Sequence, residues 1–252
     1  MDHARGTRAT RVRLILTALV LVSGALFAYL GLSLRGSPER LLGEVKVAAL
    51  EDARTVSRDI EAKFRALEQV GRGLVEELNE EPRSEEWLED RLEGIRVSKT
   101  LADQGVEVSQ AGVAFAPYRF DPDRRLFSIY VDGSSKDAQA LCYDYTRPGP
   151  QRGTCCESCP TAWYHLPMRE GPVWARPYEG SLGRPLAEFE APFDMPGEVV
   201  PGAGAGAPHS GVAWVSYEID VVREMVAEKT QGTLGWGVIF TDAENGETLL
   251  DS

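Results

Sequence analysis

The 252-residue chain is poor in the residues and motifs that most often carry enzyme chemistry. It holds only three histidines, His3, His165 and His209. It contains no G-x-S-x-G elbow, no Walker A loop and no H-E-x-x-H zinc motif. The acid pairs Asp121/Asp123 and Glu188/Glu190 are interpreted as a turn and as the solvated face of a strand, rather than as a glycosidase pair. We therefore predict no catalytic residue, no cofactor and no enzyme activity.

The sequence also lacks the basic surplus that a nucleic-acid partner requires. It has 27 Lys and Arg against 39 Asp and Glu, so the formal net charge is −12. Phosphate binding needs a basic face, and we therefore expect no nucleic-acid partner. The basic residues are unevenly spread, because residues 1–13 carry four Arg against a single Asp, a local charge of +3.

One long stretch, residues 14–34, has no charged residue at all. As a helix it reaches roughly 30 Å, the thickness of a bilayer core. A cleaved signal peptide is the alternative, but its apolar region is shorter and ends in a small-x-small site, which is absent here. We predict a transmembrane helix over 14–34, a cytoplasmic basic tail over 1–13, and residues 36–252 outside the membrane.

Cysteine is scarce, and three of the four cysteines are clustered. They are Cys142, Cys155, Cys156 and Cys159. Outside the membrane, four cysteines most simply form two disulfides, and their pairing stays open among three connectivities. A zinc site that adds His165 to the three clustered cysteines is the sharper alternative, and a redox-active C-x-x-C is the other. We predict disulfides and no metal.

Periodicity predicts two helices in the first half of the chain. Residues 38–79 place apolar side chains at steps of three and four, with Ser37 as the cap and Pro38 in the first turn. The apolar face is narrow, so the helix is expected to pack either against a partner helix, as in the seam of a parallel homodimer, or along a domain. Residues 84–101 form the second helix, with Trp87, Leu88, Leu92 and Ile95 facing inward, and Gly105 ends the helical part.

The second half of the chain has a residue pattern typical of an antiparallel sheet. Strands are expected over residues 110–120, 124–133, 140–146, 183–193 and 211–219, the first two as a hairpin. Residues 196–210 have a loop composition, residues 220–230 an amphipathic helical pattern, and residues 235–252 begin a new hairpin. The fold class is therefore α+β. We expect one domain over 36–233 and the start of a second, truncated subdomain over 234–252.

Aromatic side chains crowd into residues 162–180, a stretch that reads as neither a clean helix nor a clean strand. It contains Trp163, Tyr164, His165, Trp174 and Tyr178, separated by Pro and Gly. Core packing is one interpretation of these rings. The other is a pocket with ring walls and a few polar tips, as small-molecule sites usually have.

The order of these elements resembles the double Cache family of extracytoplasmic sensors. That family occurs in bacterial histidine kinases, chemoreceptors, diguanylate cyclases and membrane-bound serine phosphatases. The resemblance rests on residues 162–164 (A-W-Y), 174–178 (W-A-R-P-Y), 192–193 (P-F) and 211–212 (G-V). Residues 112–131 together with 143–146 are most similar to the branch linked to serine phosphatases.

The resemblance implies a long helix against an antiparallel sheet, with a membrane-distal ligand-binding module and a smaller module nearer the membrane. It implies a second membrane helix and a cytoplasmic output domain beyond residue 252. It places the chain in a bacterial cell membrane with residues 36–252 periplasmic or extracellular. Ligand binding would be relayed by the long helix.

The resemblance also implies a ligand site. Amino-acid-binding members carry an Arg where this chain has Thr161, and an Asp where it has Ser216. A free amino acid is therefore disfavoured as the ligand of this chain. In the family the Arg pairs with the carboxylate of the amino acid and the Asp pairs with its ammonium group, and this chain has neither at these positions. The ring walls would be Trp163, Tyr164, Tyr178, Tyr143 and Tyr130, with Asp144 and Ser216 as polar contacts.

The leading hypothesis is thus a membrane-anchored sensor region that binds a small molecule and pairs as a homodimer through the long helix. Two rival hypotheses remain. One is a membrane-anchored interaction module without a ligand, and the other is a metal or redox protein centred on Cys155, Cys156 and Cys159.

Overall fold

The computed structural model describes residues 43–81, 83–132, 137–149, 161–175, 177–179, 184–196, 208–230, 239–241 and 248–251. The predicted basic tail, the transmembrane helix over 14–34 and Cys155, Cys156 and Cys159 lie outside these ranges. Within them, no helix is both long enough and apolar enough to span a bilayer. The chain divides into two compact units, Met1–Arg54 and Thr55–Ser252.

The long helix predicted over 38–79 is confirmed over residues 43–80, whereas its predicted start at Ser37 and Pro38 lies outside the described residues. In the second unit its apolar stripe contributes Leu67, Leu74 and Leu78, which are fully buried. Their spacing of seven and four residues keeps them on one face. The Arg83 guanidinium donates to the Glu77 carbonyl oxygen at 3.2 and 2.9 Å, and this satisfies a carbonyl group that the helix end leaves free.

The second predicted helix is present but is split in two, α2 (Glu85–Arg96) and α3 (Lys99–Asp103). The Ser84 and Ser98 hydroxyls each cap one piece by accepting a backbone N–H, so the helix restarts after Val97. Leu88, Leu92 and Ile95 are buried as predicted, and Trp87 is half-buried. Gly105, at φ 67°, ends the helical part.

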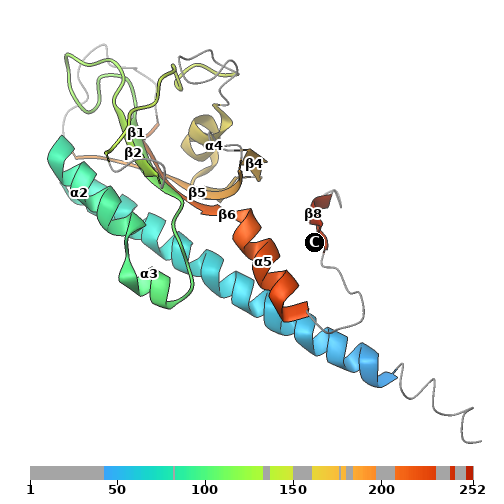
Figure 1. Cartoon of the computed structure of the whole chain (residues 1–252). Helices are drawn as coiled ribbons and strands as arrows, with labels where there is room; N and C mark the ends of the chain where they lie inside the picture. The colour runs from blue at the N-terminus through green and yellow to red at the C-terminus, as the bar shows by residue number, and fades with distance from the viewer. Residues whose placement is uncertain are drawn as a thin grey trace, which may run out of the picture. The chain divides into compact units, whose positions relative to one another are not determined.

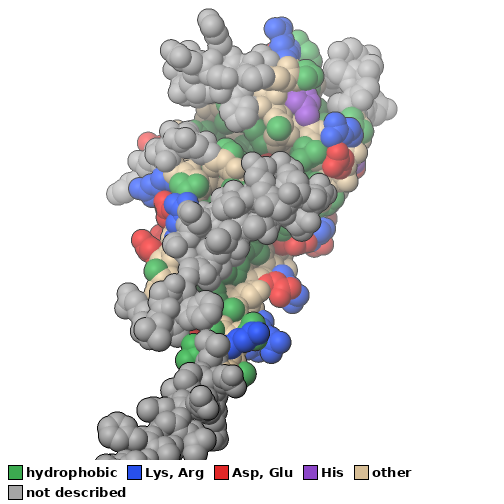
Figure 2. Space-filling model, turned by 90° about the vertical axis from the view of Figure 1, so that its right-hand side faces the viewer, with side chains coloured by type: hydrophobic (Ala, Val, Ile, Leu, Met, Phe, Trp, Pro, Cys, Tyr) green, Lys and Arg blue, Asp and Glu red, His purple; other side chains and the backbone are tan. Residues whose placement is uncertain are grey.

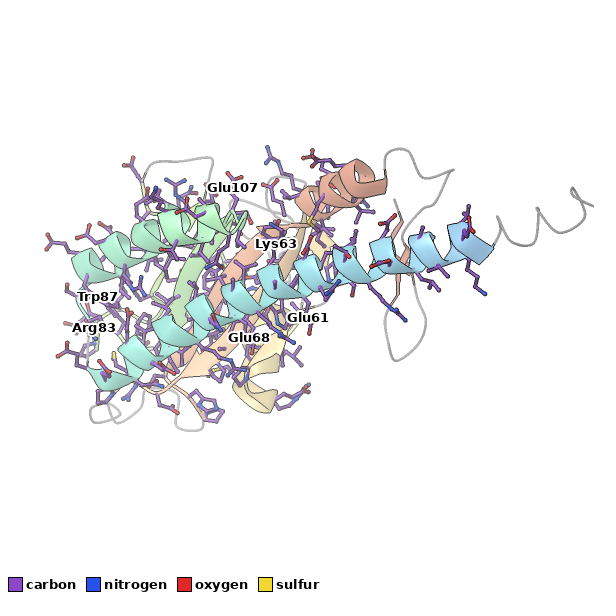
Figure 3. The ribbon with its side chains drawn as sticks, turned by 90° about the horizontal axis from the view of Figure 1, so that it is seen from below. Glu61, Lys63, Glu68, Arg83, Trp87 and Glu107 are labelled. Atoms are coloured by element: carbon purple, nitrogen blue, oxygen red, sulfur yellow. The ribbon has the colours of Figure 1, made fainter. Side chains whose placement is uncertain are left out.

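Both pieces are tied to the long helix by charged side chains. The Arg91 guanidinium holds the Glu77 carboxylate with two hydrogen bonds, at 2.6 and 2.7 Å. The Arg83 guanidinium lies 4.4 Å from the Trp87 ring centroid (Figure 3). At the other end of this layer, the Lys63 ammonium donates to the carbonyl oxygens of Gln104 and Gly105. The long helix, α2 and α3 thus form one helical layer.

The predicted sheet is present and antiparallel throughout. Its strands are β1 (Gln110–Phe115), β2 (Ser128–Asp132), β3 (Val173–Trp174), β4 (Tyr178–Glu179), β5 (Pro185–Phe193) and β6 (Gly211–Glu218). The order is β2-β1-β6-β5, and the short strands β3 and β4 both pair with the outer edge of β5. The predicted hairpin of the first two strands is confirmed as the β1–β2 pair. The α+β class is therefore confirmed.

The predicted strand over 140–146 is wrong. These residues form bends and turns, and only Gln139 pairs with Tyr130 of β2 in an isolated bridge. The Ser128 hydroxyl accepts a hydrogen bond from the Leu141 N–H at 3.0 Å, and the Asp144 carboxylate accepts one from the Thr146 N–H at 3.2 Å. Side chains thus satisfy backbone groups that a strand would have paired.

The sheet lies between two layers (Figure 1). Alternate side chains of its strands point to opposite faces. Phe189, Val215 and Tyr217 belong to the core that the long helix covers, whereas Val212 and Trp214 pack against α4 (Ala162–Glu170). Strand β6 leads directly into α5 (Ile219–Thr230), as predicted, and its Val222 and Val226 join the core on the side of the long helix.

The last predicted hairpin is confirmed as β7 (Ile239–Thr241) paired antiparallel with β8 (Thr248–Asp251). Its turn residues lie outside the described part of the chain, as do residues 197–207 of the predicted loop. The assignment of residues 234–252 to a second subdomain stays a prediction.

Candidate functional site

Helix α4 resolves the aromatic stretch that the sequence left ambiguous. The Thr161 hydroxyl, directly before the helix, donates to the Gly149 carbonyl oxygen at 3.0 Å. Nine residues are then helical even though Pro167 lies among them, and Gly171 at φ 87° ends the helix. Trp163, Tyr164, Pro167 and Met168 are buried, which is the spacing of one helical face. The expectation of an irregular segment is therefore wrong for residues 162–170, while β3 and β4 follow as short strands.

The two adjacent rings at the start of α4 enter the same cluster on the sheet. Trp163 is 8% exposed, and its ring centroid lies 4.9 Å from that of Trp214 on β6. Tyr164 is 4% exposed, and its ring centroid lies 5.0 Å from that of Tyr145. The Tyr145 hydroxyl lies 2.9 and 2.8 Å from the carbonyl oxygens of Phe115 and Phe127, so this ring is fixed to the strand ends.

Polar tips project from this ring cluster. The Trp163 Nε1–H donates to the Tyr143 hydroxyl oxygen at 2.9 Å. Burial raises the pKa of the Tyr143 phenol to about 12, and the nearby Glu188 and Tyr130 add to the rise. The Tyr130 hydroxyl donates to Gln139 Oε1 at 3.0 Å. Burial and the charge of Asp132 raise the pKa of Tyr130. Four of the predicted site rings, Trp163, Tyr164, Tyr143 and Tyr130, therefore lie together.

The interpretation of Glu188 and Glu190 as a solvated strand face is wrong. Their side chains are buried, with exposed fractions of 2% and 0%. Strand β5 is flanked on both edges, by β6 and by β3 and β4, and α4 packs on the face that carries the two carboxyl groups. Figure 2 shows acidic and basic side chains of other described residues interspersed on one face of the surface. Unlike those acids, Glu188 and Glu190 lie in the interior.

The predicted site residues Tyr178 and Ser216 adjoin this carboxyl pair. The Tyr178 hydroxyl donates to the Glu188 carboxylate. Burial raises the pKa of Tyr178, and the charges of Glu188 and Glu190 raise it further. Ser216 lies directly opposite Glu188 in the β5–β6 register and is completely buried. Its hydroxyl has no hydrogen-bond partner among the described residues.

Asp144 differs from the other predicted site residues. Its carboxylate forms ion pairs with Arg125 at 3.0 Å and Arg147 at 3.1 Å, and it accepts a hydrogen bond from the Thr146 hydroxyl at 2.6 Å. Hydrogen bonds from Thr146 and Arg125 outweigh partial burial and lower its pKa. Asp144 therefore stabilises a turn, whereas the six other predicted residues lie on the α4 side of the sheet.

Sequence reasoning missed Trp214, Glu188 and Glu190 as parts of this site. A signal for the two carboxyl groups was available. Leu186 and Pro192 lie on the same face of the strand as the glutamates, and the neighbouring strand G-V-A-W-V-S-Y is apolar on both faces. Such strands are covered on both sides, so polar residues within them are buried.

The structure leaves the metal and redox hypotheses largely untested. The described residues contain no group of three or more His, Cys, Asp and Glu side chains that could hold a metal ion. Cys142 is not a free thiol. The other three cysteines lie outside the described ranges, so the disulfide pairing stays a prediction.

A concave feature lies on the side of the sheet opposite to the ring cluster. It is an apolar cavity of about 410 Å³ between the long helix, the β3–β4 edge and α5. Ile60, Phe64, Trp174, Ile219 and Val222 line it. Because its walls belong to three different elements, the cavity leaves room for these elements to repack against one another.

Comparison with known proteins yields likeness of fold only. No family model matches the sequence, and no curated protein matches it. Two extracellular domains described as parts of histidine kinases are 16% and 13% identical, with TM-scores of 0.46 and 0.48. The matches cover 68% and 81% of this chain, and 59% and 89% of those chains.

A third match is the ligand-binding domain of an amino acid chemoreceptor from Pseudomonas aeruginosa, solved in complex with GABA. It is 16% identical with a TM-score of 0.44, over 85% of this chain and 74% of that one. The chain spans less than two thirds of the first of these three structures.

Proposed function

We propose that residues 36–233 form the ligand-binding module of a membrane-anchored, extracytoplasmic small-molecule sensor of the double Cache type. The observation that carries this proposal is the buried group under α4. There, Ser216 and Glu190 present polar atoms without hydrogen-bond partners among the described residues, and Trp214, a member of the ring cluster, lies opposite Glu190. Small-molecule sites combine apolar and aromatic walls with a few polar groups of this kind. A purely structural core pairs its polar groups.

Strand β5 supplies a route by which ligand binding would reach the long helix. Glu188 and Glu190 lie on its α4 face, and Phe189 between them lies on the other face. A Cβ atom added to Gly71 of the long helix would lie 2.6 Å from Phe189 Cδ1. The helix backbone therefore rests directly on the strand that carries the carboxyl groups.

Strand β3 gives a second contact between the site and the long helix. The Trp174 Nε1–H donates to Glu68 of the long helix at 3.5 Å, and the Trp174 ring centroid lies 4.8 Å from that of Phe64. Val173, the neighbour of Trp174, pairs with Glu190. A ligand that binds one arrangement of these strands more tightly than another would shift the helix in proportion to that difference in affinity.

The remaining parts of the proposal concern the membrane and the partner. The helix over 14–34 would anchor the module in a bacterial cell membrane, and residues 36–252 would lie outside the cytoplasm. Val45, an exposed apolar side chain of the predicted apolar stripe in the first unit, would form part of the homodimer seam. Residues 234–252 would begin the membrane-proximal subdomain. A serine phosphatase is the output domain that the sequence resemblance favours.

A thermal-shift screen of the purified chain tests the ligand-binding function. The panel contains organic acids, amino acids, amines and nucleobases at millimolar concentration. A ligand at about 100 times its Kd adds about 2.7 kcal/mol of stability, and each kcal/mol shifts the Tm of a domain of this size by about 2–4 °C.

Two substitutions at Trp163 and one control substitution test whether the ligand-dependent shift in Tm arises at the ring cluster. Trp163→Ala should abolish the ligand-dependent shift while leaving the fold largely intact, and Trp163→Phe should weaken the shift because it removes the bond to Tyr143. Trp87→Ala, which removes an equal ring from α2, should leave the shift unchanged. Normal binding of every ligand by Trp163→Ala would refute the site. A cooperative melt with no response to any compound would favour the interaction module.

A further inference from the structure

The two carboxyl groups of β5 occupy an enclosed position in the sheet. Glu188 and Glu190 are two residues apart on the same strand, so their side chains leave the same face about 7 Å apart. Ser216 and Trp214 of β6 lie directly opposite them on one side, and Val173 of β3 lies opposite Glu190 on the other. Two acids therefore lie side by side in an interior where a single charge is costly.

The protein supplies almost no partner for this pair. Glu188 accepts one hydrogen bond from Tyr178, while both carboxyl oxygens of Glu190 have no hydrogen-bond partner among the described residues. No Lys, Arg or His of the described part forms an ion pair with either glutamate. Burial raises the pKa of both groups, and the charge of Glu188 raises the pKa of Glu190 further.

A second observation is independent of the acids. The Ser216 hydroxyl is completely buried on the same face, opposite Glu188, and it too has no hydrogen-bond partner among the described residues. An unpaired buried hydroxyl costs about 1–3 kcal/mol. Three unsatisfied oxygens thus lie close together on two adjacent strands, and all three can accept a hydrogen bond.

Aromatic rings and phenols lie beside the two glutamates. Trp214 lies opposite Glu190 and contacts Trp163, and the Tyr143 phenol is close enough to Glu188 for the glutamate charge to raise its pKa. Ring faces attract cations, and carboxylates form their strongest hydrogen bonds with charged donors. An anion would meet two carboxyl groups and no basic partner, and a hard metal ion would find too few oxygen ligands, since such ions take six or more.

We propose that Glu188, Glu190 and Ser216 bind the protonated amino group of a small organic amine, which rests on the ring faces of the α4 layer. This assignment rests on the proposed sensor function and names the chemical class of its ligand. The N–H groups of a primary ammonium match the three acceptor oxygens in number. A quaternary ammonium group has no N–H and leaves all three unsatisfied.

Binding is coupled to release of a proton. Burial and the charge of Glu188 favour a protonated Glu190 in the free protein, whereas the Glu190 carboxylate must form to pair with the ammonium group. One carboxyl O–H bond breaks, its proton goes to solvent, and the ammonium charge replaces it. Affinity therefore rises by about tenfold for each pH unit until the pair ionises without ligand.

Other titratable groups near the pair do not supply that proton. Tyr130, Tyr143 and Tyr178 have raised pKa values, so these phenols keep their protons at neutral pH. Asp132 lies on β2 and is approached by the side chain of Gln139 at 3.5 Å. His165 of α4 lines a separate cavity with Pro148, Gly149 and Pro208.

Isothermal titration of the full chain tests the assignment. The probes are ethylamine, butylamine and 1,4-diaminobutane, with tetramethylammonium, 1-butanol and butyrate as matched compounds. We expect binding of the primary amines alone, stronger at about pH 8 than at about pH 6. The heat should depend on the ionisation enthalpy of the buffer, as proton release requires. If no amine binds, or if the amines bind without proton release, the assignment is overturned.

Variants separate this assignment from the sensor function on which it rests. Glu190→Gln should weaken amine binding by about 30-fold or more, and Glu107→Gln, an exposed glutamate on the other side of the sheet (Figure 3), should not. If neutral or anionic compounds bind, and Trp163→Ala abolishes that binding but Glu190→Gln does not, the sensor function stands and the amine assignment is refuted. If the amines bind and Glu190→Gln binds them equally well, the site is refuted.

Discussion

Two glycines on the long helix offer a direct measurement of how tightly the helix rests on β5. A Cβ atom at Gly71 would lie 2.6 Å from Cδ1 and 3.0 Å from Cε1 of Phe189, and 3.4 Å from Cγ2 of Val215. A Cβ atom at Gly73 would meet nothing within 4 Å. Gly71→Ala and Gly73→Ala therefore make the same chemical change on the same helix, and only the first one meets the sheet.

The expected difference follows from two opposing effects. Replacing Gly by Ala inside a helix stabilises it by about 1 kcal/mol, because Ala loses less conformational entropy. Overpacking a full core costs about 1–3 kcal/mol. Phe189 is 2% exposed, with the Trp174 ring centroid 5.5 Å away and the Arg72 guanidinium 5.4 Å from its own centroid, so it has little room to retreat.

We therefore expect Gly73→Ala to raise the free energy of unfolding by about 1 kcal/mol. Gly71→Ala should leave it unchanged or lower it by up to about 2 kcal/mol, the sum of the two effects. Urea denaturation of both variants, followed by circular dichroism, measures the difference. Equal stabilisation by the two substitutions would show that the helix does not pack against Phe189. It would refute the proposed route by which ligand binding at β5 reaches the long helix.

Three further predictions concern the sheet. Burial raises the pKa of Glu190 above its ordinary value of 4.5, so its contribution to stability is complete below about pH 4.5 and is lost as the pH rises toward the folded-state pKa. Glu190→Gln should flatten the decline in unfolding free energy between about pH 4.5 and the folded-state pKa of about 9, and an unchanged slope would contradict this. Gly211→Ala should destabilise more than Gly71→Ala, because the new Cβ would lie 2.4 Å from the Ala114 carbonyl oxygen. A melting temperature equal to wild type would count against it. Tyr145→Phe should cost about 1–3 kcal/mol in urea denaturation, since two strand carbonyls lose its hydroxyl.

The helices and paired strands could be predicted from the sequence because their signals are local. The steps of three and four along residues 43–80 fix an amphipathic helix whatever packs against it. Strands β1, β2, β5 and β6 carry β-branched and aromatic residues between turn signals. Residues 140–146 gave the same signal wrongly, because side chains of Ser128 and Asp144 satisfy their backbone groups instead.

The candidate site could be predicted only in part, because burial depends on contacts between distant segments. Trp163, Tyr143, Tyr130, Tyr178 and Ser216 were predicted, and the structure brings them to one side of the sheet.

The glutamates of β5 were misread for the same reason. Alternation along one strand reports which residues share a face, and it does not report whether that face is covered. The covering element, α4, was itself hidden by Pro167, which normally argues against a helix interior.

The alternation of β5 has a consequence for how such a protein can change over time. Its even-numbered positions 188 and 190 face α4, and its odd-numbered positions 187, 189 and 191 face the helix side. In the proposed sensor, substitutions at the first set would alter the ligand that is bound, while the second set would preserve the packing of the long helix. New ligand preferences could then arise, by natural variation or in an engineered biosensor, without a change in how the proposed signal reaches the helix. A single inserted residue in this strand would exchange the two sets and destroy both properties at once.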